Sequence, residues 1–281
     1  MKKILFFLFS ACMLISCQVI KEEDRWIEIE AKELVSRALI TECTGFLCVN
    51  CPRAAEAAHQ LLETYPDNLV VVEIHPKTNT FCQTGKPEYD FTCPEADSLY
   101  LWLGGTATTG FPTGSVNLVS GLVDYLDWPA QVLSAITKET LGKLQLSTPQ
   151  IDGRNVTLSW HAEATTSNEQ STGKEIELVT MLWLIEDSIV GPQMMPDGSQ
   201  NMNYVHNHVL RGSVLPSIFG EKNRYIINQP DNSMHPVVYT IPEMNNGQTI
   251  RMQHCAIVGV LADAKTMQVH DVQVVHLTMN N

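Results

Sequence analysis

Between residues 33 and 145, hydrophobic and polar positions follow strand-like and helix-like patterns in turn. Strand-like runs lie at residues 34–44, 69–74, 114–119 and 122–125. The second of these, LVVVEI, is almost continuously apolar, as expected of a strand covered on both faces. Helix-like runs lie at residues 52–65, 94–103 and 128–141. This order predicts a βαβ unit followed by αββα, with a hairpin turn at Ser120-Gly121.

From residue 147 onward, the pattern changes to β-rich runs separated by Gly, Asn, Pro and Asp. These runs lie at residues 156–164, 176–185, 204–211, 250–262 and 269–277. Several strands without crossover helices predict an antiparallel β-sandwich. The polar stretch at 145–153 marks the boundary. We therefore predict an α/β domain at residues 33–145 and an all-β domain at residues 150–281.

The first seventeen residues have the pattern of an export signal. Two lysines are followed by the uncharged residues 4–16, which are too few for a membrane span of about 20 residues but typical of a signal peptide. The run ends in Leu-Ile-Ser before Cys17, which resembles the lipobox of bacterial lipoproteins, where that cysteine carries the lipids. A plain secretory signal is the alternative. We predict a signal peptide at residues 1–16 and a lipid-anchored acidic tether at 17–32.

The charge balance excludes some partners and suggests a location. The 281 residues include 18 basic and 31 acidic side chains, for a net charge of −13. A surface this acidic repels phosphate backbones, which argues against nucleic acid as a partner. The acidic run at residues 21–24 resembles the signal that sends lipoproteins of Bacteroidota to the outer face of the outer membrane. No other stretch is long and apolar enough to cross a bilayer.

A C-x-x-C motif, formed by Cys48 and Cys51, lies between the first predicted strand and the first predicted helix. This position is typical of a thioredoxin-like redox site. The unpaired N–H groups and the dipole at a helix N-terminus favour the thiolate of the first cysteine, and the second can resolve a mixed disulfide. Half of a zinc site is the alternative, but no second pair at a familiar spacing completes four ligands. We predict no metal site and no cofactor.

A second signal for the thioredoxin-like fold is the sequence G-F-P-T at residues 110–113. In that fold a cis-proline precedes a strand at this place and faces the C-x-x-C motif, so we predict that Pro112 is cis. Cys48 would then be the attacking thiolate, Cys51 the resolving thiol, and Pro112 would shape the substrate groove. The sequence departs from the thioredoxin pattern at Leu47, where thioredoxins usually have Trp.

Four further cysteines lie in the predicted mature domains. Cys82 and Cys93 are ten or so residues apart, between turn residues, and an oxidising compartment would allow a disulfide worth ~3 kcal/mol. Two unpaired thiols are the alternative. Cys43 and Cys255 lie in apolar strands, which predicts small buried side chains rather than redox partners.

Histidines offer a weaker signal. His206 and His208 would place two imidazoles on one face of a strand, with Arg211 on the other face. We predict a partner-binding patch as one role for these three residues, and hydrogen bonding to neighbouring backbone as the alternative. No carboxylate or third histidine accompanies the pair locally, so a metal is not predicted. His75 follows the LVVVEI strand, where we expect it to cap the strand end.

Four segments together resemble one family. They are the lipobox, TGFLCVNCP (residues 44–52), GFPTGSVN (110–117) and YVHNHVLRG (204–212). They are similar to the Omp-twenty-eight-related outer-membrane protein family of Bacteroidota, and the resemblance covers nearly the whole mature chain. It implies an outer-membrane lipoprotein in which a thioredoxin-like domain precedes an immunoglobulin-like sandwich. The family supplies no established activity, and adhesion has been proposed for members.

Two functions remain open on the sequence. In the first, the Cys48–Cys51 dithiol exchanges disulfides with other exported proteins. In the second, Cys48 and Cys51 form a permanent disulfide, and the thioredoxin-like fold is a scaffold for a non-enzymatic binding or accessory subunit. The partner would then be another outer-membrane protein.

Overall fold

The computed structural model describes residues 35–278 except 84, 87, 88 and 120. The predicted signal peptide, the lipidation site Cys17 and the acidic tether lie outside the described residues. Within the described part of the chain, no helix has both the length and the apolar character needed to span a bilayer.

The first half contains strands and helices in the predicted order. Its elements are β1 (Ala38–Cys43), α1 (Cys51–Thr64), β2 (Leu69–Ile74), α2 (Pro94–Trp102), β3 (Thr113–Val116) and α3 (Trp128–Ile136). The second strand of the predicted hairpin is reduced to one bridge between Gly114 and Val123. The strand ends there because the Asp124 side chain accepts the backbone N–H of Leu126 and begins a 3₁₀ turn.

The second half consists mainly of strands. They are β4 (Lys143–Leu146), β5 (Gln150–Asp152), β6 (Asn155–Glu163), β7 (Glu175–Glu186), β8 (Ile189–Met194), β9 (Gln200–His206), β10 (Val209–Ser213), β11 (Glu221–Ile226), β12 (His235–Thr240), β13 (Met244–Asn245), β14 (Gln248–Thr249), β15 (Cys255–Asp263) and β16 (Val269–His276). The predicted strand at 204–211 is in fact two strands. His208 has a φ of +57°, and Asp187 Oδ1 accepts its backbone N–H at 2.7 Å, which turns the chain between them.

The helix predicted at 128–141 ends at Ile136 because tertiary contacts direct the following residues elsewhere. Asp271 of β16 accepts the backbone N–H of Leu144 at 2.8 Å, which holds β4 against the sheet. The same carboxylate pairs with Arg37, with Nε 2.9 Å from Oδ1. One buried acid therefore ties β16 to β4 and to the residues before β1.

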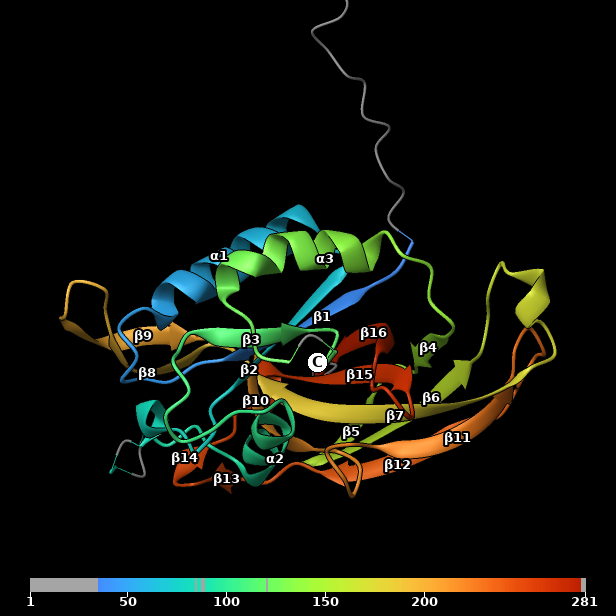
Figure 1. Ribbon diagram of the computed structural model, residues 1–281. Helices are drawn as coiled ribbons and strands as arrows, with labels where there is room; N and C mark the ends of the chain where they lie inside the picture. The colour runs from blue at the N-terminus through green and yellow to red at the C-terminus, as the bar shows by residue number, and fades with distance from the viewer. Residues whose placement is uncertain (1–34, 84, 87–88, 120, 279–281) are drawn as a thin grey trace, which may run out of the picture. The chain divides into compact units, whose positions relative to one another are not determined.

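One large sheet runs through both halves of the chain, in the order β16-β15-β7-β10-β2-β1-β3, with β11 also paired to β7 (Figure 1). β1 lies between the parallel β2 and the antiparallel β3. The join between the halves is narrow: β10 pairs with β2 at Val209 and Glu73, and the backbone N–H of Glu73 donates to the His208 carbonyl at 2.8 Å. A second sheet has the order β12-β6-β4, with β5 also on β6.

Among the described residues, three large apolar cores hold these layers together. Helices α1 and α3 lie on the same side of β1 and β3 (Figure 1), and the core beneath them contains Ile40 and Trp128. A second core joins α2 to the opposite face of the large sheet and includes Trp183 of β7. The third core lies between the two sheets and includes Leu182 of β7 and Trp160 of β6. Because successive residues of a strand face opposite sides, β7 is buried on both faces.

Candidate functional site

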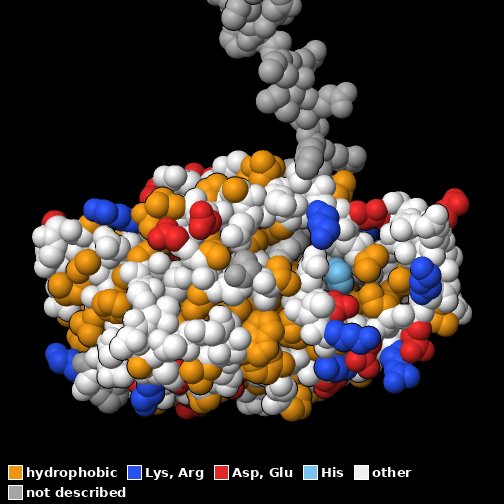
Figure 2. Space-filling model, in the orientation of Figure 1, with side chains coloured by type: hydrophobic (Ala, Val, Ile, Leu, Met, Phe, Trp, Pro, Cys, Tyr) orange, Lys and Arg blue, Asp and Glu red, His pale blue; other side chains and the backbone are white. Residues whose placement is uncertain are grey.

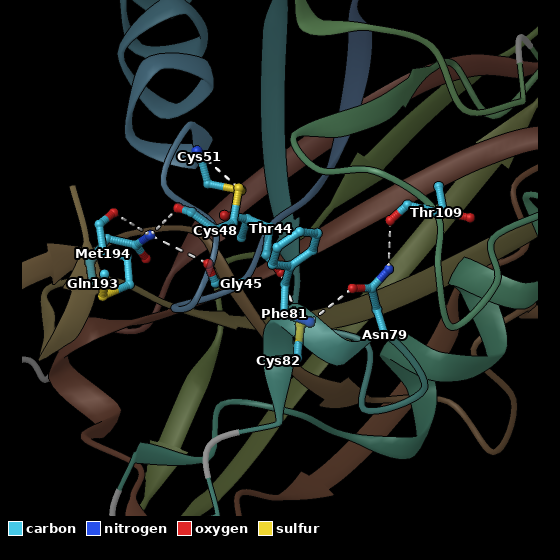
Figure 3. Close-up of a disulfide and its surroundings, with 10 residues drawn as sticks. All are labelled: Thr44, Gly45, Cys48, Cys51, Asn79, Phe81, Cys82, Thr109, Gln193 and Met194. Carbon is cyan, nitrogen blue, oxygen red and sulfur yellow. Dashed lines mark hydrogen bonds between the residues drawn. A yellow bond between two sulfur atoms is a disulfide. The ribbon is translucent and has the colours of Figure 1, made fainter. Parts of the chain in front are cut away.

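The C-x-x-C segment lies between the end of β1 and the start of α1. The Cys48 backbone N–H donates to the Gly45 carbonyl at 3.0 Å, which closes the loop, and Pro52 occupies the first turn of the helix. Cys48 and Cys51 form a disulfide. The Cys51 backbone N–H also donates to the Cys48 sulfur at 3.1 Å (Figure 3). The chain therefore places the first cysteine at a helix N-terminus, as the sequence predicted.

Both cysteines are buried, with 1% of each residue exposed, although the neighbouring Leu47 and Val49 are each 40% exposed. The β8–β9 hairpin packs against the backbone of this loop. The Gln193 side-chain amide Nε2 lies 3.3 Å from the Gly45 carbonyl and 2.9 Å from the Cys48 carbonyl (Figure 3). A reagent that attacks either sulfur would first have to displace the residues that cover the disulfide.

The segment after β2 closes another side of the loop. The Phe81 carbonyl accepts the Leu47 backbone N–H at 3.1 Å, and a Cβ added at Gly45 would lie 2.7 Å from the same carbonyl oxygen. Asn79 holds this segment in place, because its side-chain amide donates to the Tyr100 hydroxyl at 2.9 Å and its oxygen accepts the Phe81 backbone N–H. Glycine is therefore required at position 45 by lack of space.

Pro112 lies at the same edge of the sheet as the disulfide loop. The Phe111–Pro112 peptide bond is cis, which confirms the prediction. The next residue, Thr113, is the β-sheet partner of Cys43, the last residue of β1. The Phe111 ring stacks on Phe81 with the ring centroids 5.7 Å apart. Pro112 is thus placed beside the loop that carries the C-x-x-C motif.

The predicted disulfide between Cys82 and Cys93 does not form, and both thiols are free and buried. The Cys82 thiol donates to the Thr44 carbonyl at 3.1 Å, whereas the Cys93 sulfur lies 3.6 Å from the Leu210 carbonyl. The prediction was wrong because the two cysteines pack against different strands. Burial raises the pKa of the Cys93 thiol to about 12, so it is not a reactive thiolate at neutral pH.

Cys43 and Cys255 are free and buried, which confirms their predicted role as small core side chains. Burial raises the pKa of the Cys43 thiol, and the neighbouring Cys82 adds to the effect. Burial also raises the pKa of Cys255 to about 12, assisted by the charge of Glu186. Neither thiol has the electropositive, accessible environment of a redox partner.

Two buried carboxyl groups lie beneath α1. Glu42 of β1 and Glu73 of β2 are register partners, and both line a cavity of about 420 Å³ together with Pro52 and Tyr204. Burial raises the pKa of Glu42 to about 8. Burial also raises the pKa of Glu73 well above its usual range, and the charge of Glu42 adds to this. The sequence did not single out either residue, since a lone Glu within an apolar strand gives no sign of its neighbour on the next strand.

The predicted pairing of His206 with His208 is wrong. His206 ends β9 and is 2% exposed, whereas His208 follows the turn and its Nδ1 lies 3.1 Å from Asp187 Oδ1. The ring of His206 instead lies 5.9 Å from the ring of His75, which follows β2. Burial lowers the pKa of His206 to about 4 and holds the pKa of His75 well below its usual value, so both rings are neutral at pH 7.

Arg211 is also not part of an exposed patch, as only 4% of it is accessible to solvent. Its Nε lies 3.2 Å from Glu186 Oε2, and Arg251 approaches the other oxygen of Glu186 at 3.3 Å. Burial removes His206 and Arg211 from any protein-binding surface. The partly exposed His208 stays a candidate for such a surface.

The family described as outer membrane protein Omp28 matches residues 106–281. No curated protein matches the chain. HBP35 of Porphyromonas gingivalis has a similar fold, with a TM-score of 0.60 at 12% identity over 89% of this chain and 80% of that one. A domain of the outer membrane lipoprotein Omp28 from the same organism matches 50% of this chain and 92% of its own length, at 18% identity and a TM-score of 0.36.

The family match covers well over half of the residues. It bears out both the family resemblance and the outer-membrane location that the motifs predicted. The chain belongs to the Omp28 family of outer membrane proteins.

Proposed function

We propose that this chain is a lipid-anchored binding or accessory subunit at the surface of the outer membrane, and that Cys48–Cys51 is a closed structural disulfide. The observation that carries the proposal is the burial of both cysteines, each 1% exposed. Anchoring at Cys17 and exposure at the cell surface rest on the lipobox and on the acidic run that follows it.

Disulfide exchange requires a thiolate to reach one of the two sulfur atoms. Gln193 and the backbone of the β8–β9 hairpin hold the loop closed, since Met194 also donates its N–H to the Phe46 carbonyl at 2.8 Å. The exposed neighbours of Cys48 are apolar and present no group that would activate an incoming thiol. A buried, well-bonded disulfide is typical of a structural bond.

The architecture we propose has a thioredoxin-like scaffold at residues 33–145 and an immunoglobulin-like sandwich at residues 150–281. The first is supported by β1 lying between a parallel and an antiparallel neighbour, with α1 and α3 on one face and α2 on the other. The second is supported by the apolar core between β7 and β6. Both units would provide binding surface and would not catalyse a reaction.

A binding subunit also needs a surface that contacts its partner, and α2 offers one. Leu101 and Trp102 at the end of this helix are 52% and 43% exposed, and the Trp102 ring lies 6.0 Å from that of Phe219. Figure 2 shows hydrophobic side chains on the face that carries α2. Exposed tryptophan is enriched among residues that dominate the binding energy of protein interfaces.

The redox potential of Cys48–Cys51 tests the proposal. The full chain, purified in detergent, is equilibrated across a thiol/disulfide buffer series, alkylated, and examined by peptide mass spectrometry. We expect a midpoint below about −300 mV, as for structural disulfides. A midpoint between about −120 and −270 mV would place the pair among working oxidoreductases and overturn the proposal. The buried Cys255 thiol is the internal control, because it is alkylated only when the chain unfolds.

Lipid anchoring is tested separately with Cys17→Ser. We expect the variant to lose the mass of the lipid and to leave the membrane fraction, whereas Cys255→Ser should stay anchored. Protease treatment of intact cells then reports on exposure. Retention of Cys17→Ser in the membrane fraction would contradict anchoring through this residue.

A second candidate, thiol–disulfide exchange, is favoured by one observation. The Cys51 backbone N–H donates to the Cys48 sulfur at the start of α1, an arrangement that would stabilise a Cys48 thiolate after reduction. The Cys51→Ser variant should then trap mixed disulfides through Cys48, and the Cys48→Ser variant should not. Absence of trapped species together with a midpoint below about −300 mV would exclude exchange.

A further inference from the structure

Three buried side chains that could bind a metal meet where β9 approaches the end of β2. Glu73 and His75 are two residues apart and face the same side of the sheet, and His206 ends β9. One donor atom from each lies within 4.8 Å of the other two. We propose that Glu73, His75 and His206 bind a divalent transition-metal ion, of which Zn²⁺ fits best. This site is independent of the function proposed above.

Three of the four imidazole nitrogens in this cluster lack other partners. Both ring nitrogens of His75 and Nε2 of His206 have no hydrogen-bond partner among the described residues. The residues are only 3% and 2% exposed, so bulk water does not satisfy these atoms either. Buried polar groups are almost always paired with protein, water or an ion, and an unpaired set that converges on one point is therefore where a bound ion would be expected.

The surroundings of His206 suit a metal ligand. The backbone of Pro192 lies near the ring, and because proline has no N–H group, only its carbonyl can bond to the ring. Nε2 has no partner among the described residues. A neutral ring that donates from Nδ1 would present its lone pair on Nε2, and this is the arrangement by which proteins orient histidine ligands of metals.

Aromatic rings surround the two imidazoles and keep the cluster dry. The Phe91 ring lies 5.5 Å from the ring of His75 and 4.8 Å from that of His206, in edge contacts. The Tyr204 ring also lies 4.8 Å from that of His206. Such an apolar wall limits the motion of the ligands and excludes competing water.

The charges nearby also suit a divalent cation. Glu42 is the register partner of Glu73, and neither of its carboxylate oxygens has a hydrogen-bond partner among the described residues. If both carboxyl groups lose their protons when the ion binds, their two charges balance those of one divalent ion. Arg211, which helps to lower the pKa of His75, is itself paired with Glu186 at 3.2 Å.

The donor set selects the metal class. Two imidazoles and one carboxylate suit Zn²⁺ and related ions, whereas Ca²⁺ and Mg²⁺ take oxygen ligands. Bonds of about 2.0–2.2 Å to a tetrahedral Zn²⁺ place donors about 3.4 Å apart. The present separations of up to 4.8 Å require small side-chain rotations only. The bound ion would join β9 to β2 and thereby hold the hairpin over the Cys48–Cys51 disulfide.

The test uses the full chain in detergent, with its disulfide oxidised, after removal of metal by a chelator and dialysis. Zn²⁺ is titrated in, bound metal is counted by mass spectrometry, and the thermal midpoint is followed. We expect one Zn²⁺ per chain and a higher midpoint. Co²⁺ as a probe should give the absorption of a nitrogen and oxygen site without a sulfur-to-cobalt band. A sulfur band, or less than one tightly bound Zn²⁺, would overturn the proposal.

His75→Leu and His206→Leu remove donors while keeping the positions apolar. Each should weaken Zn²⁺ binding by more than about 100-fold, since loss of even an outer hydrogen-bond partner costs about 10–100-fold. Metal-free His75→Leu should be at least as stable as the metal-free parent, because it removes two unpaired nitrogens. Glu73→Gln, which keeps size and polarity, replaces either variant that fails to fold. His161→Ala is the control, because His161 lies on β6 with its Nδ1 3.0 Å from the Ser233 carbonyl and is not part of the cluster, so it should not affect binding.

Retention of tight Zn²⁺ binding by His75→Leu and His206→Leu would place the metal elsewhere. Loss of binding in His161→Ala would assign it to the second sheet, far from the cluster along the chain. Either result would refute the buried site.

Discussion

The side chain of Gln193 provides the sharpest test of why the disulfide is inaccessible. It is 2% exposed, and its Nε2 lies 2.9 Å from the Cys48 carbonyl, 3.3 Å from the Gly45 carbonyl and 3.2 Å from the Met194 carbonyl. Gln193→Ala removes this amide and leaves the two cysteines unchanged. The substitution should therefore loosen the β8–β9 hairpin over the disulfide without touching its chemistry.

The expected size of the effect follows from the hydrogen bonds lost. An amide nitrogen carries two hydrogens, so at most two of the three contacts are well made at one time. Two neutral hydrogen bonds contribute about 1–3 kcal/mol in total, at about 0.5–1.5 kcal/mol each. If local opening exposes the sulfurs, the open population should rise about 5- to 150-fold.

The assay is the rate of disulfide reduction by a small thiol in native buffer, followed by alkylation and mass spectrometry of the Cys48–Cys51 peptide. When opening and closing are fast, this rate follows the open population. Gln200→Ala is the matched control, because Gln200 lies on the same hairpin and is exposed. Equal rates for the parent and Gln193→Ala would refute the role of the hairpin, as would equal acceleration in both variants.

Three further predictions concern stability, measured by denaturant unfolding. Gly45→Ala should destabilise by about 1–3 kcal/mol because its Cβ has no room, whereas Gly110→Ala, where the space is open, should be near neutral. Asp271→Asn should cost about 2–4 kcal/mol, since it leaves the Arg37 guanidinium without its partly buried partner, and a loss below about 0.5 kcal/mol would show that the pair is only a surface contact. Burial holds the pKa of His270 below 6.5. As the pH falls, His270 therefore binds a proton in the unfolded chain before it does so in the folded chain. Stability falls as the pH drops below about 6.5 toward the folded-state pKa. The free energy of unfolding of His270→Gln should fall less than that of the parent between roughly pH 7.5 and 5.

The order of elements in the first half could be predicted because each one has a strong local pattern. The continuous apolar run of β2 and the one-sided pattern of α1 require no knowledge of distant residues. The position of Cys48 and Cys51 at the helix start followed from the same local order. Sequence reasoning succeeded where the physical cause lies within about one element of the residue concerned.

The errors concern contacts between distant segments. Nothing in the local pattern indicates that Cys93 faces β10 rather than Cys82. The direction of the Cys93 thiol is determined by its packing against β10, a strand far away in the sequence. Likewise, the turn at His208 depends on Asp187, which accepts its backbone N–H. A strand pattern continues through this residue, so the sequence suggested one strand where tertiary hydrogen bonding produces two.

The β8–β9 hairpin links the two sites, and this has a measurable consequence. It supplies Gln193 to the disulfide loop and His206 to the proposed metal cluster. An ion that binds only when β9 lies against β2 stabilises the closed hairpin by mass action. At a free Zn²⁺ concentration about 100 times the dissociation constant, opening of the hairpin should be about 100-fold less frequent, and reduction of the disulfide correspondingly slower.

The comparison of variants separates this coupling from general stabilisation. Zn²⁺ should slow reduction in Gln193→Ala as well, because Gln193 does not contact the cluster. At the same concentration it should slow reduction of His75→Leu by less than about 2-fold. If Zn²⁺ binds at one ion per chain but leaves the reduction rate of the parent unchanged, the disulfide is exposed by a motion in which β9 stays in place. The disulfide would then have to become accessible at the Phe81 side of the loop, where the Leu47 N–H donates to the Phe81 carbonyl.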